Sequence, residues 1–548
     1  MTGTSEVFAS VLNRLKRFKI FPAIQRFAAH NRRVFPLAPD AARRKPVVLF
    51  ELNLLRSAHI AYSYCANVLA TEHRARIVAY APQRLQSWRQ RLYFWIKCAI
   101  GLDPFGAYTS FGTTGFLEVV PSTVQKAKAK ELIETVLPLL RNKRDVEELV
   151  IDGVLVGDLI YDSYLSVFRK PTIEFDSSEF QHFLLNSLEL YVFWNDYFNT
   201  QDVRAINVSH CVYTVAIPLR LALKRGIPAF QANVTHIYRL TERNLFAYND
   251  FFYFPERFAA LPSDVREAGL AEAERRIKRR FAGEVGVDMG YSTKSAYGEN
   301  RYARLLQPSQ RKKILIATHC FFDSPHGYGN NLFPDFYEWL SFLGEISEAT
   351  DYDWYIKTHP DYLDGTKEII DALVAKYPKF TLLPADASHH QIIAEGIDLA
   401  LTTWGTIAFE YAALGIPVIN ASRNNPHIAY DFNLHAKGVE DYRRMLLNLD
   451  RLDLKIDKRK VCEYYFMRNI YNTEDLFFES YDKAVDDLGG YSGQFEVEVY
   501  DRWLQDWSPE RHRTIVAALR AFVRSGDFRM DYTHYGREFT FESTEGQV

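Results

Sequence analysis

DWYIKTHPDY (residues 353–362) and GIDLALTTWGTIAFEYAALGIPVIN (residues 396–420) are the two stretches of sequence that decide the fold class. In the second stretch, residues 397–401 are an apolar run of strand length and 402–405 a turn. Residues 406–414 follow as a helix that ends at Gly415, and Pro417 opens the next strand. This order predicts a β-α-β unit with a polar turn at the carboxyl end of its first strand, which is where open α/β sheets bind ligands.

Polar side chains gather at the ends of the two predicted strands. We expect Thr406 to cap a helix whose free N–H groups and positive dipole end suit a phosphate, and Glu410 to lie one turn further, within reach of sugar hydroxyls. Lys357 and His359 would bring cationic or donor groups to the same crevice. These residues predict a nucleotide-sugar site. The alternative is a structural crossover without a ligand, because such units occur in many α/β domains.

The order of these motifs resembles the carboxyl-terminal half of bacterial GT-B glycosyltransferases that build capsule and other surface polysaccharides. The residues that carry the resemblance are Lys357-Thr358-His359-Pro360 and Thr402-Thr403-x-Gly405-Thr406-x-x-x-Glu410. The sequence is similar to capsule-type Kdo transferases, to sialyl- and polysialyltransferases with a His-Pro motif, and to CDP-glycerol glycerophosphotransferases. The resemblance covers about residues 310–430. It implies an α/β GT-B fold of two Rossmann-like, doubly wound domains facing a central cleft, with extra terminal helices. It also implies a nucleotide-sugar donor as substrate and no cofactor.

Length and composition exclude several classes of protein. A chain of 548 residues is too long for one core. A net charge of −2 gives no reason to expect a nucleic-acid partner. Five scattered cysteines without a CxxC pair fit a reducing compartment and no structural zinc. We find no signal peptide and no run of about 18 apolar residues, and therefore expect a cytoplasmic protein that does not span a membrane.

We predict four parts of the chain: a basic amphipathic segment (1–44), a Rossmann-like acceptor domain (45–300), a Rossmann-like nucleotide-sugar domain (301–485) and a helical extension (486–548). Residues 5–36 carry seven Lys and Arg and no acid after Glu6, with apolar residues at helical spacing up to Pro22. Such a segment can lie on an anionic membrane surface, at the inner face of the cytoplasmic membrane, or pack on the domain as a solvated helix.

Three residues of the acceptor domain are candidates for the catalytic base. Asp152 and Asp158 lie in the apolar stretch LVIDGVLVGDLIYDSYLS, where unpaired acids would be costly. Some His-Pro sialyltransferases carry their base in an acidic-Gly motif, which Asp152-Gly153 half matches, although Ile151 takes the place of its first acid. His210 follows the predicted strand 204–209, at the same kind of strand-to-helix turn as 402–406.

The loop after the predicted strand 313–317 supplies one more candidate residue for binding the nucleotide-sugar donor. His319 lies where GT-B enzymes approach the donor phosphates. Together with Asp323 and His326 it could look like a set of metal ligands, but no fourth ligand follows at a regular spacing. We expect a metal-independent site.

These expectations add up to an enzyme that transfers a sugar from a CMP-, UDP- or GDP-linked donor to a surface polysaccharide or its lipid-linked precursor. The sequence does not decide whether the transfer inverts or retains the configuration of the anomeric carbon. The alternatives are a CDP-alditol phosphotransferase of the teichoic-acid type, an epimerase of the UDP-N-acetylglucosamine type, and a non-catalytic sugar-nucleotide or glycan-binding partner of a polysaccharide synthase.

Overall fold

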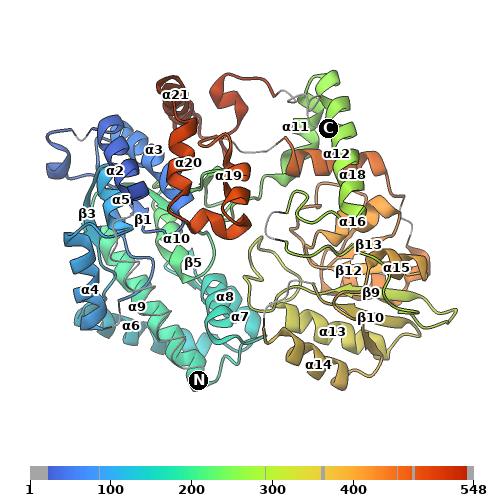
Figure 1. The fold of residues 1–548 in the computed structure, drawn as a ribbon. Helices are drawn as coiled ribbons and strands as arrows, with labels where there is room; N and C mark the ends of the chain where they lie inside the picture. Colours follow the sequence, from blue (N-terminus) through green and yellow to red (C-terminus); the bar gives the residue numbers. More distant parts are fainter. Residues whose placement is uncertain are drawn as a thin grey trace, which may run out of the picture.

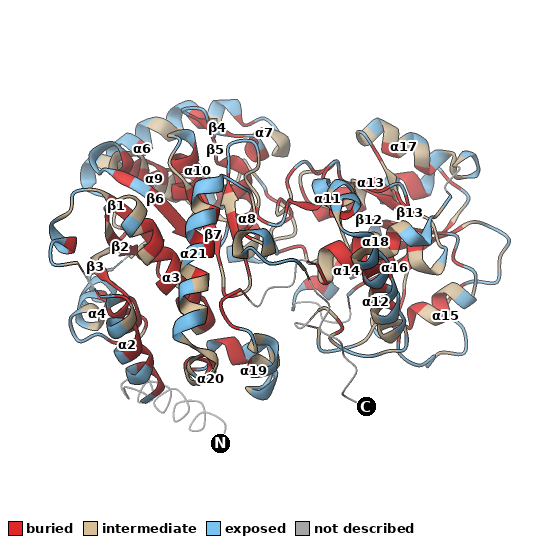
Figure 2. Cartoon of the chain, turned by 90° about the horizontal axis from the view of Figure 1, so that it is seen from above, coloured by how far each residue is buried: buried red, intermediate tan, exposed pale blue. Residues whose placement is uncertain are grey.

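A computed structural model describes residues 22–36, 38–85, 87–289, 292–359, 364–452, 455–471 and 476–539. They form two lobes, each built on a six-stranded sheet (Figure 1). The strands of both sheets are buried beneath helices that expose one side to solvent (Figure 2). The molecule is therefore an α/β protein with two separate sheet cores.

The amino-terminal lobe has the strand order β3-β2-β1-β6-β7-β8, in which β8 alone is antiparallel to its neighbour. The strands are β1 (Val47–Glu51), β2 (Arg76–Tyr80), β3 (Thr113–Leu117), β6 (Val203–Val208), β7 (Ala229–Ala232) and β8 (Ile237–Leu240). The central strand β1 is buried along its whole length, as expected where helices cover both faces of a parallel sheet. A small hairpin of β4 (Val150–Ile151) and β5 (Val154–Leu155) stands apart from this sheet. The helices here are α3 (Arg56–Glu72), α4 (Trp88–Ala99), α5 (Phe105–Ser110), α6 (Thr123–Val136), α7 (Lys143–Glu147), α8 (Gly157–Phe168), α9 (Ser178–Thr200) and α10 (Ile217–Lys224).

The carboxyl-terminal lobe has the strand order β11-β10-β9-β12-β13-β14, with every pair parallel. The predicted β-α-β unit is present as β12, α16 and β13, with Leu401 in register with Ile419. The strands are β9 (Lys313–Ala317), β10 (Asp353–Lys357), β11 (Phe380–Leu382), β12 (Leu399–Thr402), β13 (Val418–Asn420) and β14 (Leu434–His435). The helices are α13 (Phe336–Glu348), α14 (Thr366–Lys376), α15 (His389–Ala394), α16 (Ile407–Leu414), α17 (Val439–Leu447) and α18 (Lys458–Asn469). Both sheets have the crossover order of Rossmann-like folds, which confirms the predicted GT-B fold class.

The packing of the connecting helices differs from the predicted limits of 45–300 and 301–485. Helices α11 (Phe254–Ala260) and α12 (Ser263–Phe281) pack on α18, in a core cluster with Phe409 and Tyr464 of the carboxyl-terminal lobe. The change of lobe therefore comes near residue 250. Both helices are amphipathic, and such a pattern does not say which lobe will cover the apolar side.

The predicted helical extension from 486 contains helices and packs on the amino-terminal lobe. Helix α21 (Pro509–Ser525) packs on α3, and α20 (Val499–Asp506) packs on α2 (Pro22–Val34). Tyr500 stacks on Phe27 with ring centroids 4.1 Å apart. Buried residues from Leu476 to Met530, including those near α19 (Tyr481–Asp487), belong to the same cluster as Phe50. These last helices complete the first core.

Part of the predicted membrane-surface segment 5–36 lies outside the described residues, which begin at 22. In α2 the apolar residues Ile24 and Phe27 are buried against the lobe, and Arg26 forms an ion pair with Asp501 at 2.6 Å. The described half of the segment is therefore a helix packed on the domain. Among the described helices, none is both long and apolar enough to cross a bilayer.

Candidate active site in the cleft between the two sheets

The carboxyl ends of β9 and β12 place two predicted residues side by side. His319 follows β9 in the chain, and its Nε2 atom lies 3.0 Å from Oγ1 of Thr402, the last residue of β12. The same Oγ1 atom accepts a hydrogen bond from the backbone N–H of Gly405 at 3.1 Å, which fixes the turn before α16. The structure therefore brings His319, Thr402 and Gly405 together at one sheet edge.

Glycine at position 405 is required by this close approach. A Cβ atom there would lie 2.8 Å from Thr402 Oγ1 and 3.2 Å from His319 Cε1. The His319 ring is also held by Trp404 and Phe336, with centroids at 4.4 and 4.9 Å. Burial, reinforced by nearby His359, lowers the pKa of His319 to about 3, so the ring is neutral at pH 7. His319 can orient a ligand by hydrogen bonding but does not add a positive charge.

Lys357 supplies the charge at this edge. It is the last residue of β10, it is buried, and its Nζ atom donates to the carbonyl of Ala385 at 3.1 Å. The hydrogen bonds of Lys357 Nζ go to the carbonyl oxygens of Thr358 and Ala385, and no ion pair of Lys357 is found among the described residues. Burial lowers the pKa of Lys357 to about 8, with Asp386 and Glu410 partly opposing the shift. A mostly protonated ammonium group at the carboxyl end of a parallel strand suits a phosphate. His359 follows on the exposed side, while Pro360 lies outside the described residues.

Thr406 and Glu410 differ from their predicted geometry. Helix α16 begins at Ile407, and the side chain of Thr406 makes no capping hydrogen bond. Glu410 is buried, and its Oε1 atom accepts hydrogen bonds from Arg280 Nε at 2.9 Å and Nη2 at 2.5 Å. Tyr297 donates to its Oε2 atom at 2.9 Å. Both oxygens are already occupied by protein donors, because α12 packs on this lobe and carries Arg280 to the site.

Across the cleft, the amino-terminal sheet presents a chain of hydrogen bonds that includes His210. Ser209 donates through Oγ to Glu51 Oε1 at 2.5 Å and through its backbone N–H to Oε2 at 2.9 Å. His210 Nδ1 lies 3.0 Å from Ser209 Oγ. When Glu51 is ionised, the Ser209 proton is directed at Glu51 and His210 donates from Nδ1. Nε2 of the neutral ring is then an acceptor to which no described residue donates.

The environment keeps His210 neutral. Its side chain is accessible but lies deep in the cleft, and this desolvation lowers its pKa, with Asp323 partly opposing the shift. Burial raises the pKa of Glu51 to about 7, against the two hydrogen bonds from Ser209. Glu51 is not among the site residues predicted from the sequence. The sequence feature that could have identified Glu51 is its place as the acidic last residue of the otherwise apolar run VVLFE.

A cavity of about 980 Å³ lies between the lobes beside His210. Asn53, Ser209 and Asn233 line it from the carboxyl ends of β1, β6 and β7, and Arg468 of α18 lines it from the other lobe. Tyr213 donates to Asp323 Oδ1 at 2.8 Å, so the loop after β9 reaches the amino-terminal lobe next to His210. The loop at the carboxyl end of β9 thus lies next to the carboxyl end of β6.

The structure does not place Asp152 or Asp158 with His210. Asp158 is buried in α8, where Arg220 Nη2 lies 2.7 Å from its Oδ2 and the backbone N–H of Leu159 donates to its Oδ1 at 2.9 Å. Asp152 is exposed at the β4–β5 turn and accepts a hydrogen bond from Tyr191 at 3.0 Å. Of the three candidate bases, His210 has the free acceptor atom in the cleft.

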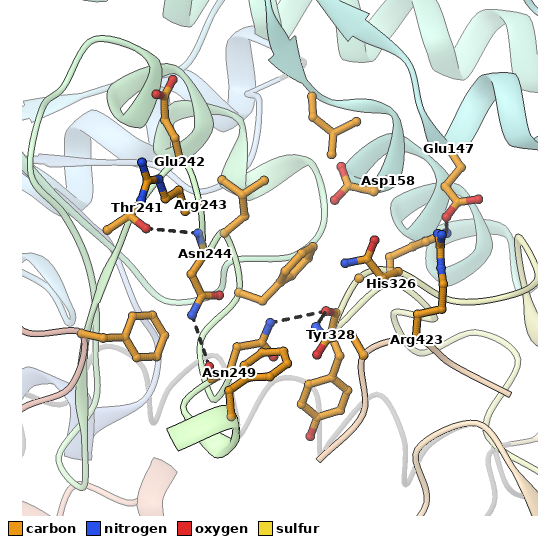
Figure 3. A pocket seen from close by; sticks show the side chains of 18 of the residues that line it. Glu147, Asp158, Thr241, Glu242, Arg243, Asn244, Asn249, His326, Tyr328 and Arg423 are labelled. Atoms are coloured by element: carbon orange, nitrogen blue, oxygen red, sulfur yellow. Dashed lines mark hydrogen bonds and ion pairs between the residues drawn. The ribbon is translucent and has the colours of Figure 1, made fainter. Parts of the chain in front are cut away.

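Asp158 lines a second cavity of about 610 Å³ at the junction of the lobes, together with His326 (Figure 3). His326 Nδ1 lies 2.5 Å from Asp162 Oδ1 of α8, and its Nε2 lies 3.5 Å from Glu147 Oε1. The residues that could have resembled metal ligands therefore have separate partners, Thr402 for His319, Tyr213 for Asp323 and Asp162 for His326. Within the described ranges, no group of three His, Cys, Asp or Glu residues is placed to hold a metal ion.

Comparison with known proteins yields structural likeness only. No protein-family model and no curated protein matches the chain. A solved structure of Thermosulfurimonas dismutans KpsC, a beta Kdo 2,4 transferase, is 13% identical over 49% of this chain and 79% of its own, with a TM-score of 0.31. UDP-GlcNAc 2-epimerase from Neisseria meningitidis is 10% identical over 78% and 97% of the two chains, with a TM-score of 0.20. A glycosyltransferase from Rickettsia africae is 11% identical over 85% and 100%, with a TM-score of 0.22. These scores are low, so the fold class rests on the strand orders of the two sheets.

Proposed function

We propose that this chain is a GT-B glycosyltransferase that moves a sugar from a nucleotide-sugar donor to a hydroxyl of a bacterial surface polysaccharide or of its lipid-linked precursor. One observation carries the proposal. Lys357 and the turn Thr402–Gly405 lie at the carboxyl end of one Rossmann-like sheet, and His210 lies at the carboxyl end of the other. The Tyr213–Asp323 hydrogen bond joins the loop after β9 to the amino-terminal lobe beside His210.

The proposed reaction needs a base on one side and charge stabilisation on the other. The acceptor hydroxyl oxygen bonds to the anomeric carbon, the bond from that carbon to the donor phosphate oxygen breaks, and its electron pair leaves with the phosphate. The hydroxyl proton goes to His210 Nε2, and Lys357 stabilises the charge that develops on the phosphate. The Glu51–Ser209 pair holds the His210 ring with Nε2 toward the cleft.

Arg468 supplies a second positive charge in the cavity. Its Nη2 atom donates to Tyr328 OH at 3.5 Å, and among the described residues it forms no ion pair with a carboxylate. A guanidinium group without an acidic partner is suited to a diphosphate or to a carboxylated sugar, because it binds two oxygens at once. The supporting roles of His359, Thr406 and Glu410 in donor binding stay predictions.

The test is the melting temperature of the protein with CMP, CDP, UDP, GDP and ADP, each in turn. A ligand at 100 times its Kd adds about 2.7 kcal/mol to the free energy of unfolding, which is easily measured as a higher melting temperature. We expect one nucleotide to stabilise the protein, Gly405→Ala to abolish the effect, and Gly298→Ala to preserve it, since a Cβ at Gly298 meets no atom within 4 Å.

Assays of turnover separate this function from its alternatives. Sugar transfer that requires an added glycan supports the proposal. Conversion of the donor without an acceptor indicates an epimerase, and transfer of an alditol phosphate from a CDP donor indicates a phosphotransferase. Nucleotide binding without any turnover indicates a non-catalytic partner. No stabilisation by any nucleotide would contradict the assignment of the site.

A further inference from the structure

Helix α4 turns its apolar side toward solvent. All twelve of its residues are described, and Phe94 is the buried one. Six large apolar side chains on and just after the helix are between 41% and 69% exposed: Trp88, Leu92, Tyr93, Trp95, Ile96 and Ile100. Folded soluble domains rarely leave so many large apolar groups together in water. This exposed set is called the α4 face below.

The α4 face is continuous along the helix. Trp88, Leu92, Trp95 and Ile96 recur at intervals of three and four residues, which places them on one side. Phe94 points to the opposite side, where its ring packs on Phe105 at 5.1 Å. The helix is thus attached to the lobe through its minor apolar side. The larger side stays exposed, with the Trp95 side chain hydrogen-bonded to Glu118.

Basic residues border the α4 face. Arg89, Arg91 and Lys97 are on the helix, and residues 84–102 contain no acid. Arg91 forms an exposed ion pair with Glu118, while the Lys97 and Arg89 cations lie over the Tyr93 and Trp88 rings at 4.4 and 5.6 Å. Tryptophan and long aliphatic side chains bordered by Arg and Lys are typical of helices that lie in the interface of a bilayer.

The position of α4 suits contact with a large flat surface. Figures 1 and 2 both show the helix on the outer side of the amino-terminal lobe, away from the carboxyl-terminal lobe. A membrane could cover it without covering the cleft. Helix α2 belongs to the basic segment 5–36, for which the sequence left a membrane surface and packing on the domain equally open, and it uses its apolar side internally.

We propose that the α4 face inserts into the interfacial region of an anionic phospholipid bilayer, with Arg89, Arg91 and Lys97 at the level of the headgroups. The positive charge of the helix selects anionic lipid, and the aromatic and aliphatic side chains supply the apolar burial. The inference stands on the geometry of α4 and does not depend on the proposed sugar transfer.

The experiment is co-sedimentation of the full chain with phosphatidylcholine vesicles, with and without phosphatidylglycerol. We expect binding to the anionic vesicles, weaker binding in high salt, and an affinity at least about tenfold lower for Trp95→Glu/Ile96→Glu. The matched control is Val124→Glu/Val167→Glu, which adds the same charges at positions 66% and 65% exposed on α6 and α8. The control should bind as the wild type does.

Circular dichroism and the melting temperature verify that both variants fold. Equal vesicle binding by the wild type and the folded α4 variant would overturn the proposal, as would no binding by the wild type. A concentration-dependent dimer that the α4 substitutions dissociate would overturn it too, because the face would then belong to a second copy of the chain. The vesicle readout is separate from nucleotide stabilisation, so failure here leaves the proposed function standing.

Discussion

The Nδ1 atom of His326 lies 2.5 Å from Oδ1 of Asp162, and this contact joins the two lobes where neither side chain reaches solvent. Burial acts to lower the pKa of His326, but Asp162 and Glu147 outweigh it and raise that pKa well above its ordinary value. Burial also raises the pKa of Asp162, with His326 opposing the shift. Because the pKa of His326 is raised well above its ordinary value, the shared proton lies on His326 at neutral pH and the contact is a buried ion pair between the lobes.

Removing one member of this pair should be costly. We expect His326→Ala to lower the free energy of unfolding by about 3 kcal/mol, because Asp162 is left as a buried charge without a partner. Urea unfolding at pH 7 measures the loss. The control is Lys460→Ala, which breaks the exposed Lys460–Asp431 pair and should cost less than about 1 kcal/mol. Equal losses in the two variants would contradict a buried, charged junction.

Acid should destabilise the fold through its buried histidines. Burial lowers the pKa of His236 and His319 to about 3, and that of His427 well below its ordinary value. Below about pH 6.5 the unfolded chain binds protons at these sites while the folded chain does not, so stability is full above that pH and falls as the pH drops toward 3. Each such histidine contributes a loss of about 1.4 kcal/mol per pH unit at the steepest part.

His427 allows the acid effect to be measured at one site, since neither of its ring nitrogens has a described hydrogen-bond partner. Between pH 6 and 4, His427→Leu should reduce the number of protons taken up on unfolding by about one. The slope of the unfolding free energy against pH should fall accordingly. Unfolding in urea at several pH values gives both slopes. An unchanged slope would show that His427 is not held neutral.

Single substitutions at the three candidate bases should have different effects and so distinguish their roles. His210→Gln should lower kcat by about 10² to 10⁴ and leave nucleotide stabilisation intact, because it removes the proton acceptor and not the donor site. Asp158→Asn should lower stability instead, since it leaves the buried Arg220 without its counter-ion. Asp152→Asn, at an exposed turn, should change neither. Loss of turnover only in Asp152→Asn would return the assignment to the acidic-Gly motif.

The pH profile gives a second readout for His210. Because its pKa lies below the ordinary value, kcat/KM should rise with pH below about 6.5 and be flat above neutral. A profile that keeps rising above pH 8 would indicate a different base.

Glu410→Ala should be unstable, contrary to what the position of Glu410 in the sequence implies. Arg280 would remain largely buried without its partner, at a cost of about 3 kcal/mol. The double variant Arg280→Met/Glu410→Leu should be closer to the wild type than either single variant. The test is a double-mutant cycle of urea unfolding, and additive losses would show that the two side chains do not act as a pair.

The two sheets could be predicted from local sequence patterns. Features that depend on contacts between residues far apart in the sequence could not. The strand, turn and helix at 397–414 could be read directly because Gly405, Gly415 and Pro417 mark the changes of direction. Glu51 was missed because its partner Ser209 is 158 residues away. The occupation of Glu410 by Arg280 depends on which lobe α12 covers, and the outward face of α4 depends on which of its two apolar sides packs. Amphipathic patterns contain neither piece of information.

The return of residues 476–530 to the first lobe has a consequence for biosynthesis. The amino-terminal lobe has two core clusters, and the one that contains Phe50 is incomplete in a nascent chain after residue 250, because Tyr500, Trp503 and Phe522 belong to it and are not yet made. The second sheet is complete by residue 435 and is free to fold while the first still waits. The Phe50 cluster is then completed after the second sheet although its strands are made first, and its apolar surface stays exposed until residues 476–530 are made.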